Sequence, residues 1–177
     1  MIEREKYLNQ LLLFKDTGLI KVVTGVRRCG KSSLLALMQE RLRQEGVEAN
    51  RIISFQMESM EFDAIRDYQS LYATVKGRIE SIPRPYLFFD ELQEVEGWER
   101  TINSLRADGD CDIYITGSNA HLLSSELSTL LSGRYVEVEM LPLVFSEYLA
   151  FRGIAAPATH DPQAIAEDRD GSPVSLG

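Results

Sequence analysis

A glycine-containing loop between a strand pattern and a helix pattern has the clearest chemistry in this sequence. Residues 25–32 read GVRRCGKS and fit G-x-x-x-x-G-K-S/T. Glycines let the backbone turn so that N–H groups point inward, and the helix start adds partial positive charge there. Lys31 is placed to reach the β- and γ-phosphates of a nucleotide, and the Ser32 hydroxyl to bind Mg²⁺. The predicted phosphate-binding residues are Gly25, Val26, Arg27, Arg28, Cys29, Gly30, Lys31, Ser32 and Ser33.

A pair of carboxylates follows a second apolar run. In YLFFDELQ, residues 86–93, Asp90 falls at the carboxyl end of a buried strand and Glu91 comes directly after it. Such an aspartate suits a water of the Mg²⁺ shell, and the glutamate suits accepting a proton from, or orienting, an attacking water. Acidic pairs also simply end strands and begin helices. It is the combination with the phosphate loop that favours a hydrolytic site.

Two further positions have both a functional and a structural interpretation. The fourth strand pattern ends in a polar turn at Thr116, Gly117, Ser118 and Asn119. Its side chains either bond the γ-phosphate or the water, or cap the next helix, where Ser118 and Asn119 are favoured cap types. Arg134 follows Gly133 and either neutralises carbonyls at a helix end or reaches the γ-phosphate of a neighbouring subunit. Arg27 and Arg28 are interpreted as solvated loop charges rather than catalysts.

The elements that must position these groups alternate along the chain. Short β-rich runs predict strands at 19–24, 51–57, 85–89, 111–116 and 135–141. Patterns with helical spacing predict helices at 31–44, 68–81, 98–108 and 119–132, the first with an apolar side made of Leu34, Leu35, Leu37, Met38 and Leu42. Strands that alternate with helices predict an α/β fold with a parallel sheet and helices on both faces.

The two ends of the chain differ in composition from each other. An amphipathic helix is expected at 3–16, and a short helix at 142–151 after the last strand. From Gly153 onward the sequence is rich in Ala, Pro, Asp and Ser. We expect one ATPase domain over 1–152, and a disordered tail or linker over 153–177 that leads to a further C-terminal domain outside the chain.

Composition limits the classes of partner. A net charge of −8 opposes broad non-specific attraction to nucleic acid or anionic lipid, and weakly favours a protein partner. The sequence has no run of eighteen apolar residues and does not open like a signal peptide, which predicts a cytoplasmic protein without a membrane span. Two distant cysteines, Cys29 and Cys111, suggest neither a disulfide framework nor a zinc site.

With the phosphate loop, YLFFDE, ITGSNA and LLSGRY in this order, residues 2–152 resemble the AAA-like ATPases of the additional-strand, catalytic-glutamate P-loop class. More narrowly, they are similar to bacterial and archaeal ATPases whose ATPase domain precedes a C-terminal DUF4143 domain. The resemblance implies a three-layer P-loop NTPase with a five-stranded sheet in the order 5-1-4-3-2. It also implies that Ser118 or Asn119 is a sensor of the γ-phosphate, and that Arg134 is an arginine finger.

The leading hypothesis is an ATPase with ATP and Mg²⁺ as ligands, whose nucleotide state drives a conformational change in an attached domain or partner. The expected partners are further copies of the chain, in a homo-oligomer, or another protein. An alternative is a nucleotide-binding switch with little turnover. In that case hydrolysis would require Arg134 from a neighbouring subunit, a further domain, or both. A small-molecule P-loop kinase is a weaker alternative, since the Asp90 and Glu91 pair favours water as the acceptor. A GTPase is disfavoured because the sequence lacks the N/T-K-x-D guanine motif.

Overall fold

A five-stranded parallel sheet forms the centre of the protein, in a computed structural model that describes residues 2–117 and 129–142. The strand order is β2-β3-β4-β1-β5, and each neighbouring pair is parallel. The α/β fold and the strand order are therefore both confirmed. The strands are β1 (Ile20–Gly25), β2 (Ile52–Gln56), β3 (Tyr86–Asp90), β4 (Asp112–Thr116) and β5 (Tyr135–Met140).

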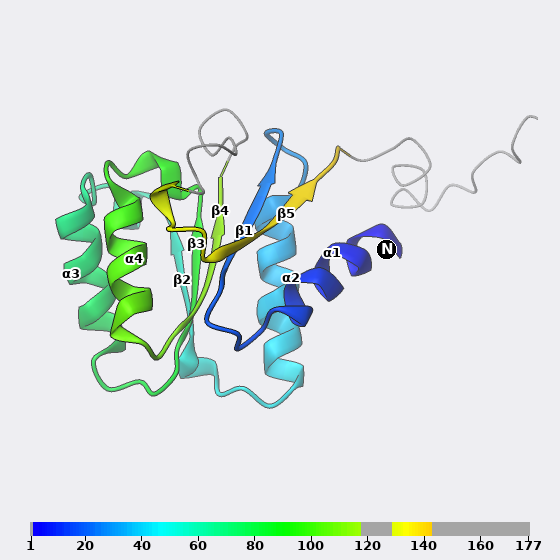
Figure 1. The fold of residues 1–177 in the computed structure, drawn as a ribbon, viewed down its shortest axis with the longest axis horizontal. Helices are drawn as coiled ribbons and strands as arrows, with labels where there is room; N and C mark the ends of the chain where they lie inside the picture. The colour runs from blue at the N-terminus through cyan, green and yellow to red at the C-terminus, as the bar shows by residue number, and fades with distance from the viewer. Residues whose placement is uncertain (1, 118–128, 143–177) are drawn as a thin grey trace, which may run out of the picture. The chain divides into compact units, whose positions relative to one another are not determined.

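Helices cover both faces of this sheet, as Figure 1 shows. The helices α3 and α4 lie on one face, and α1 and α2 on the other. Their bounds are α1 (Ile2–Leu13), α2 (Lys31–Gln44), α3 (Tyr68–Ile79) and α4 (Trp98–Asp108). Short 3-10 turns lie at Ala49–Arg51, Met60–Phe62 and Leu92–Glu94. The three-layer arrangement is the one that the sequence predicts.

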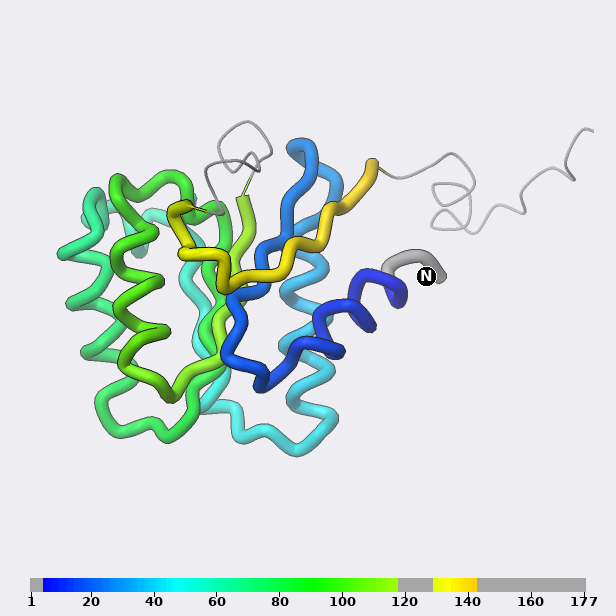
Figure 2. The backbone as a smooth tube through the Cα atoms, viewed as in Figure 1, coloured from blue at the N-terminus to red at the C-terminus, as the bar shows by residue number. Residues whose placement is uncertain are grey.

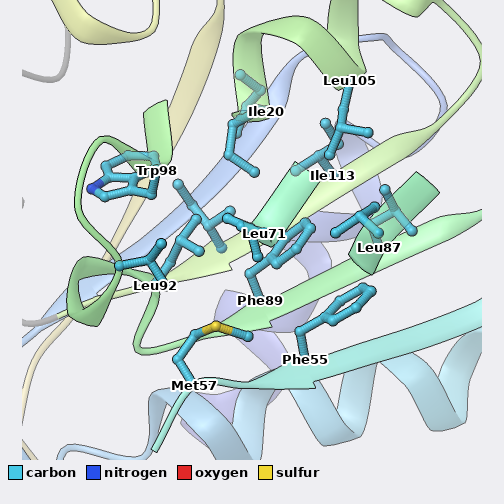
Figure 3. Packing of buried hydrophobic residues seen from close by; sticks show 14 of the residues in the cluster. Ile20, Phe55, Met57, Leu71, Leu87, Phe89, Leu92, Trp98, Leu105 and Ile113 are labelled. Carbon is cyan, nitrogen blue, oxygen red and sulfur yellow. The ribbon is translucent and has the colours of Figure 1, made fainter. Parts of the chain in front are cut away.

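The two layers of helices give the sheet two hydrophobic cores. Successive strand residues point to opposite faces, so Leu87 and Phe89 face α3 and α4, while Tyr86 and Phe88 face α2. Figure 3 shows the core between the sheet and the helices α3 and α4 at close range. Burial on both faces explains why these strands read as nearly unbroken apolar runs.

Local sequence signals set the ends of the helices. Asp67 caps α3 by accepting hydrogen bonds from the N–H groups of Gln69 and Ser70, which completes a capping box. The helix α2 ends just before Gly46, which has a φ of +87°. One predicted core residue of α2 is misassigned: Leu37 is 37% exposed, because it lies outside the stripe that faces the sheet.

The structure describes one compact unit, from Ile2 to Pro142. The helix predicted at 142–151, the tail predicted at 153–177 and most of the helix predicted at 119–132 lie outside the described residues, so the domain boundary at 152 stays a prediction. Within the described part of the chain, the helices are too short or too polar to cross a membrane.

A buried polar network lies near the amino ends of β1, β3 and β4. Asp112 pairs with Lys21, accepts a hydrogen bond of 2.8 Å from the Tyr114 hydroxyl and accepts one of 3.2 Å from the Asp16 N–H. The Tyr86 hydroxyl donates to Asp16 Oδ1 at 2.9 Å. Burial lowers the pKa of Lys21 against the opposing effect of Asp112, while burial and the nearby carboxylate of Asp16 raise the pKa of Tyr86 to about 12.

Candidate nucleotide-binding site

Figure 2 shows the path of the backbone in the loop that joins β1 to α2. Glycine and tight packing around Gly25 shape this loop. A Cβ atom on Gly25 would lie 2.5 Å from the carbonyl oxygen of Met140 and 2.7 Å from Cys29 Sγ, so only glycine fits. Arg28 and Gly30 both have positive φ, 66° and 97°. Such left-handed residues turn the chain so that N–H groups face a common concavity.

The amino end of α2 offers free donors at this loop. Gly30 precedes the helix with no side-chain cap, and the first backbone hydrogen bond of the helix runs from Leu34 N to Gly30 O at 3.0 Å. The N–H groups of Lys31, Ser32 and Ser33 therefore have no partner within the helix. Together with the positive end of the helix dipole, they form a binding place for an anion.

Asp90 joins the loop to two neighbouring strands. The Ser32 hydroxyl donates to Asp90 Oδ1 at 3.0 Å, although the two residues are 58 positions apart. The Thr116 hydroxyl donates to the same oxygen at 2.6 Å and accepts from the Glu91 N–H at 3.0 Å. Thr116 is fully buried at the carboxyl end of β4, so it fixes the position of Asp90 relative to the loop.

Lys31 and Glu91 form an ion pair beside this contact. Lys31 Nζ lies 3.3 Å from Glu91 Oε1, and it also donates to the carbonyl oxygen of Gly25 at 3.4 Å. The exposed fractions of the two side chains are 3% and 16%. Glu91 has left-handed backbone, with a φ of 53°, which turns its side chain back toward the loop. The lysine is therefore almost entirely buried, while the glutamate keeps a small exposed area.

A cavity of about 280 Å³ adjoins the two carboxylates. Asp90 and Glu91 line it together with Gln56, the last residue of β2, and with Glu58 and Ser59, which follow that strand. The cavity lies on the side of β3 toward β2, whereas the loop follows β1, which is separated from β3 by β4. The cavity therefore gives solvent access to Asp90 and Glu91 from the β2 side.

The side-chain oxygen atoms of Ser32 and Asp90 fit a magnesium ion. Ser32 and Asp90 supply a hydroxyl and a carboxylate that already contact each other. No group of three or more His, Cys, Asp or Glu side chains is placed to hold a metal ion by itself, as far as the described residues go. Mg²⁺ is commonly held by one or two protein oxygens together with substrate phosphates, so the sparse donor set suits it.

The predicted site residues that the structure describes lie in two separate regions. The loop residues, Asp90 and Glu91 come together at the carboxyl ends of β1 and β3, with Arg27 and Arg28 exposed on the surface as interpreted. Ser118 and Asn119 lie outside the described residues. Arg134 is exposed at the opposite, amino end of β5, where its carbonyl oxygen accepts a hydrogen bond from Ile20.

The distance between Arg134 and the loop follows from the strand. Met140 pairs with Gly25 at the other end of β5, which places Arg134 roughly 20 Å from the loop along the strand. Arg134 therefore lies too far away to act on a nucleotide at the loop of its own chain.

Two site contacts have no strong local signal in the sequence. Thr116 lies in the polar turn at the end of β4, but its bond to Asp90 depends on β4 lying beside β3. Gln93 donates from Nε2 to Glu91 Oε2 at 2.6 Å, a contact that depends on the left-handed backbone of Glu91. The signal that points to Thr116 is its position: it is a polar residue at the carboxyl end of β4, and β4 lies beside β3, the strand that ends in Asp90.

Known structures share this fold. A DNA polymerase III gamma subunit-related protein of Thermotoga maritima is similar with a TM-score of 0.57 and 10% identity, over 81% of this chain and 48% of that one. The Pif1 helicase of Candida albicans is similar with a TM-score of 0.54 and 14% identity, over 84% of this chain and 41% of that one. At such identities the similarity shows the fold alone.

Sequence comparison gives nearer relatives and the family. An uncharacterized protein of Haemophilus influenzae is 46% identical over 155 residues, and one of Methanocaldococcus jannaschii is 34% identical over 138 residues. The matched regions cover 87% and 75% of this chain but only 39% and 29% of those proteins. The model of the AAA domain family matches residues 17–149, which include every described residue of the loop, the carboxylates and the sheet. The chain therefore belongs to the AAA domain family of P-loop proteins.

Proposed function

We propose that this chain binds Mg·ATP at the loop of residues 25–33 and hydrolyses it. The observation that supports this most strongly is the pair of contacts between the loop and the strand-end carboxylates, Ser32 to Asp90 at 3.0 Å and Lys31 to Glu91 at 3.3 Å. Phosphate-binding groups and water-activating groups are thereby adjacent. This is the arrangement that transfer of a phosphoryl group to water requires.

Each residue has a distinct role in the proposed reaction. Lys31 and the free N–H groups of α2 bind the phosphates, while Ser32 and Asp90 hold Mg²⁺, which neutralises phosphate charge when bound. Glu91 accepts a proton from water as the water oxygen bonds to the γ-phosphorus and the bond to the β-phosphate oxygen breaks. Thr116 keeps Asp90 in place through its 2.6 Å hydrogen bond.

The finer features of the proposal rest on the family resemblance. We propose ATP rather than GTP because the sequence lacks the guanine motif. Ser118 or Asn119 is proposed to sense the γ-phosphate. Arg134 is proposed to complete the site of a second copy, which its exposed position at the far edge of the sheet favours. The nucleotide state would then drive a conformational change in an attached domain or partner.

Single-turnover hydrolysis of Mg·ATP by the wild type and by Glu91→Gln tests this proposal. We expect the wild type to release phosphate, with a rate that rises with protein concentration if Arg134 acts between copies. We expect Glu91→Gln to bind Mg·ATP and to lose turnover by at least about 100-fold, the usual contribution of a general base. Turnover in Glu91→Gln equal to the wild type, or none in the wild type at any concentration, would contradict the proposal.

A further inference from the structure

The side-chain amide of Gln93 contacts the carboxylate of Glu91 on the side away from Lys31. Gln93 Nε2 donates a 2.6 Å hydrogen bond to Glu91 Oε2, whereas Lys31 Nζ lies 3.3 Å from Glu91 Oε1. The two contacts use different oxygens, so the carboxylate is held from both sides. Because only 16% of the Glu91 side chain is exposed, bulk water competes weakly for these contacts.

The backbone around Gln93 is anchored in the core. Leu92–Glu94 forms a 3-10 turn, which is closed by the hydrogen bond from Val95 N to Leu92 O at 3.1 Å. Leu92 and Val95 are 0% and 1% exposed, and Leu92 is visible among the packed side chains of Figure 3. The N–H of Glu91 is tied to Thr116 at 3.0 Å. The turn therefore presents Gln93 to Glu91 from a fixed position.

The other end of the same amide has no partner. Gln93 Oε1 is buried and accepts no hydrogen bond from the residues that the structure describes. An acceptor left in this state costs free energy, so the hydrogen bond from Nε2 to Glu91 is the contact that holds the amide in place against this cost.

Binding of a nucleotide separates the two contacts of Glu91. The phosphates attract Lys31, because a lysine of such a loop reaches the β- and γ-phosphates. Glu91 then loses its cation and retains the amide, which has no net charge and leaves the carboxylate free to accept a proton. We propose that Gln93 is the positioning residue that holds Glu91 toward the attacking water once Lys31 has moved to the phosphates. This inference rests on the proposed function, in which Glu91 is the base.

The test compares Gln93→Met with a matched control, Gln69→Met, on the exposed surface of α3. Both variants receive the same substitution, and only Gln93 contacts Glu91. We expect Gln93→Met to lower kcat for Mg·ATP by about 10- to 100-fold, the scale of a misplaced catalytic group, with an unchanged equilibrium Kd for Mg·ATP. Gln69→Met should match the wild type. Gln93→Leu likewise removes the donor and adds no charge beside Glu91, and should lose kcat as well if Gln93→Met folds poorly.

A double-mutant cycle with Glu91→Gln distinguishes positioning from a general structural effect. If Gln93 acts through Glu91, Gln93→Met lowers the single-turnover rate of the wild type but leaves the residual rate of Glu91→Gln unchanged. A kcat within twofold of the wild type in both Gln93 variants, or an equal loss in both backgrounds of the cycle, would overturn the inference. If Glu91→Gln loses turnover while Gln93→Met keeps full turnover, the role proposed for Gln93 is wrong and the proposed ATPase function stands. If Glu91→Gln keeps full turnover, the proposed function itself is contradicted.

Discussion

The Nζ atom of Lys31 lies 3.3 Å from Glu91 Oε1, so the proposed phosphate ligand and the proposed base neutralise each other in this structure. Phosphate must compete with Glu91 for the lysine. Glu91→Gln removes the competing charge, and we expect it to bind Mg·ATP a few-fold more tightly than the wild type in equilibrium titration. Glu94→Gln, on the exposed side of the same turn, is the control. Weaker binding in Glu91→Gln would show that the ion pair does not compete with the nucleotide.

The contact between Thr116 and Asp90 predicts that Thr116→Val lowers the stability of the fold and raises the magnesium concentration needed for ATP hydrolysis. Thr116→Val removes the hydroxyl that bonds Asp90 and the Glu91 N–H, and losing such hydrogen bonds costs about 0.5–1.5 kcal/mol each, or up to about 3 kcal/mol for one to a carboxylate, in the free energy of unfolding. Thr101→Val is a matched control, because its buried hydroxyl donates at 2.6 Å to the Tyr68 carbonyl away from the site.

Denaturant unfolding should show that both threonine variants are destabilised. Titration of ATP hydrolysis with Mg²⁺ should show a raised magnesium requirement in Thr116→Val alone. The same requirement in both variants would contradict the role given to Thr116.

Of two glycine substitutions, Gly25→Ala should disrupt the loop, whereas Gly77→Ala should stabilise the fold. Gly25→Ala places a Cβ 2.5 Å from the backbone oxygen of Met140, so we expect it to distort the loop and abolish nucleotide binding. Gly77 lies within α3 with open space around its Cβ position, and Gly77→Ala should raise the free energy of unfolding by about 0.5–1 kcal/mol. Thermal unfolding and nucleotide titration of both variants check this. A Gly25→Ala variant that binds ATP normally would contradict the packing argument.

The buried network predicts a loss of stability at alkaline pH. The pKa of Tyr86 is raised to about 12, so the folded state keeps this proton while the unfolded chain loses it near pH 10. The stabilising contribution is fully present below pH 10 and is lost as pH rises from 10 to about 12. Tyr86→Phe should remove up to about 2 kcal/mol of this decline in unfolding free energy. An unchanged decline would show that Tyr86 does not cause it.

The local patterns of the sequence were sufficient for the strands and helices among the described residues, and for the loop. The helix of residues 98–108 was predicted with the bounds that α4 has, and the residues of the loop lie where a strand meets a helix. The strand order came from the family resemblance, since no local pattern specifies which strands are neighbours.

Particular side-chain contacts between strand ends, and contacts that depend on special backbone, could not be predicted. The strand order implied by the resemblance puts β4 beside β3, but it does not specify the hydrogen bond from Thr116 to Asp90. The contact from Gln93 to Glu91 requires a left-handed residue that is not glycine. The burial of Lys21 against Asp112 was missed for a related reason, because a lysine inside a strand pattern usually faces solvent.

Equilibrium binding of Mg·ATP to the wild type and to Lys31→Ala tests the central claim most directly. Lys76→Ala is the control, because it removes a surface lysine that pairs with Asp108 on α4. We expect Lys31→Ala to lose affinity by at least about tenfold, which corresponds to 1.4 kcal/mol, and to keep its fold, with Lys76→Ala binding like the wild type. Equal affinity of the wild type and Lys31→Ala would show that the nucleotide does not bind at this loop.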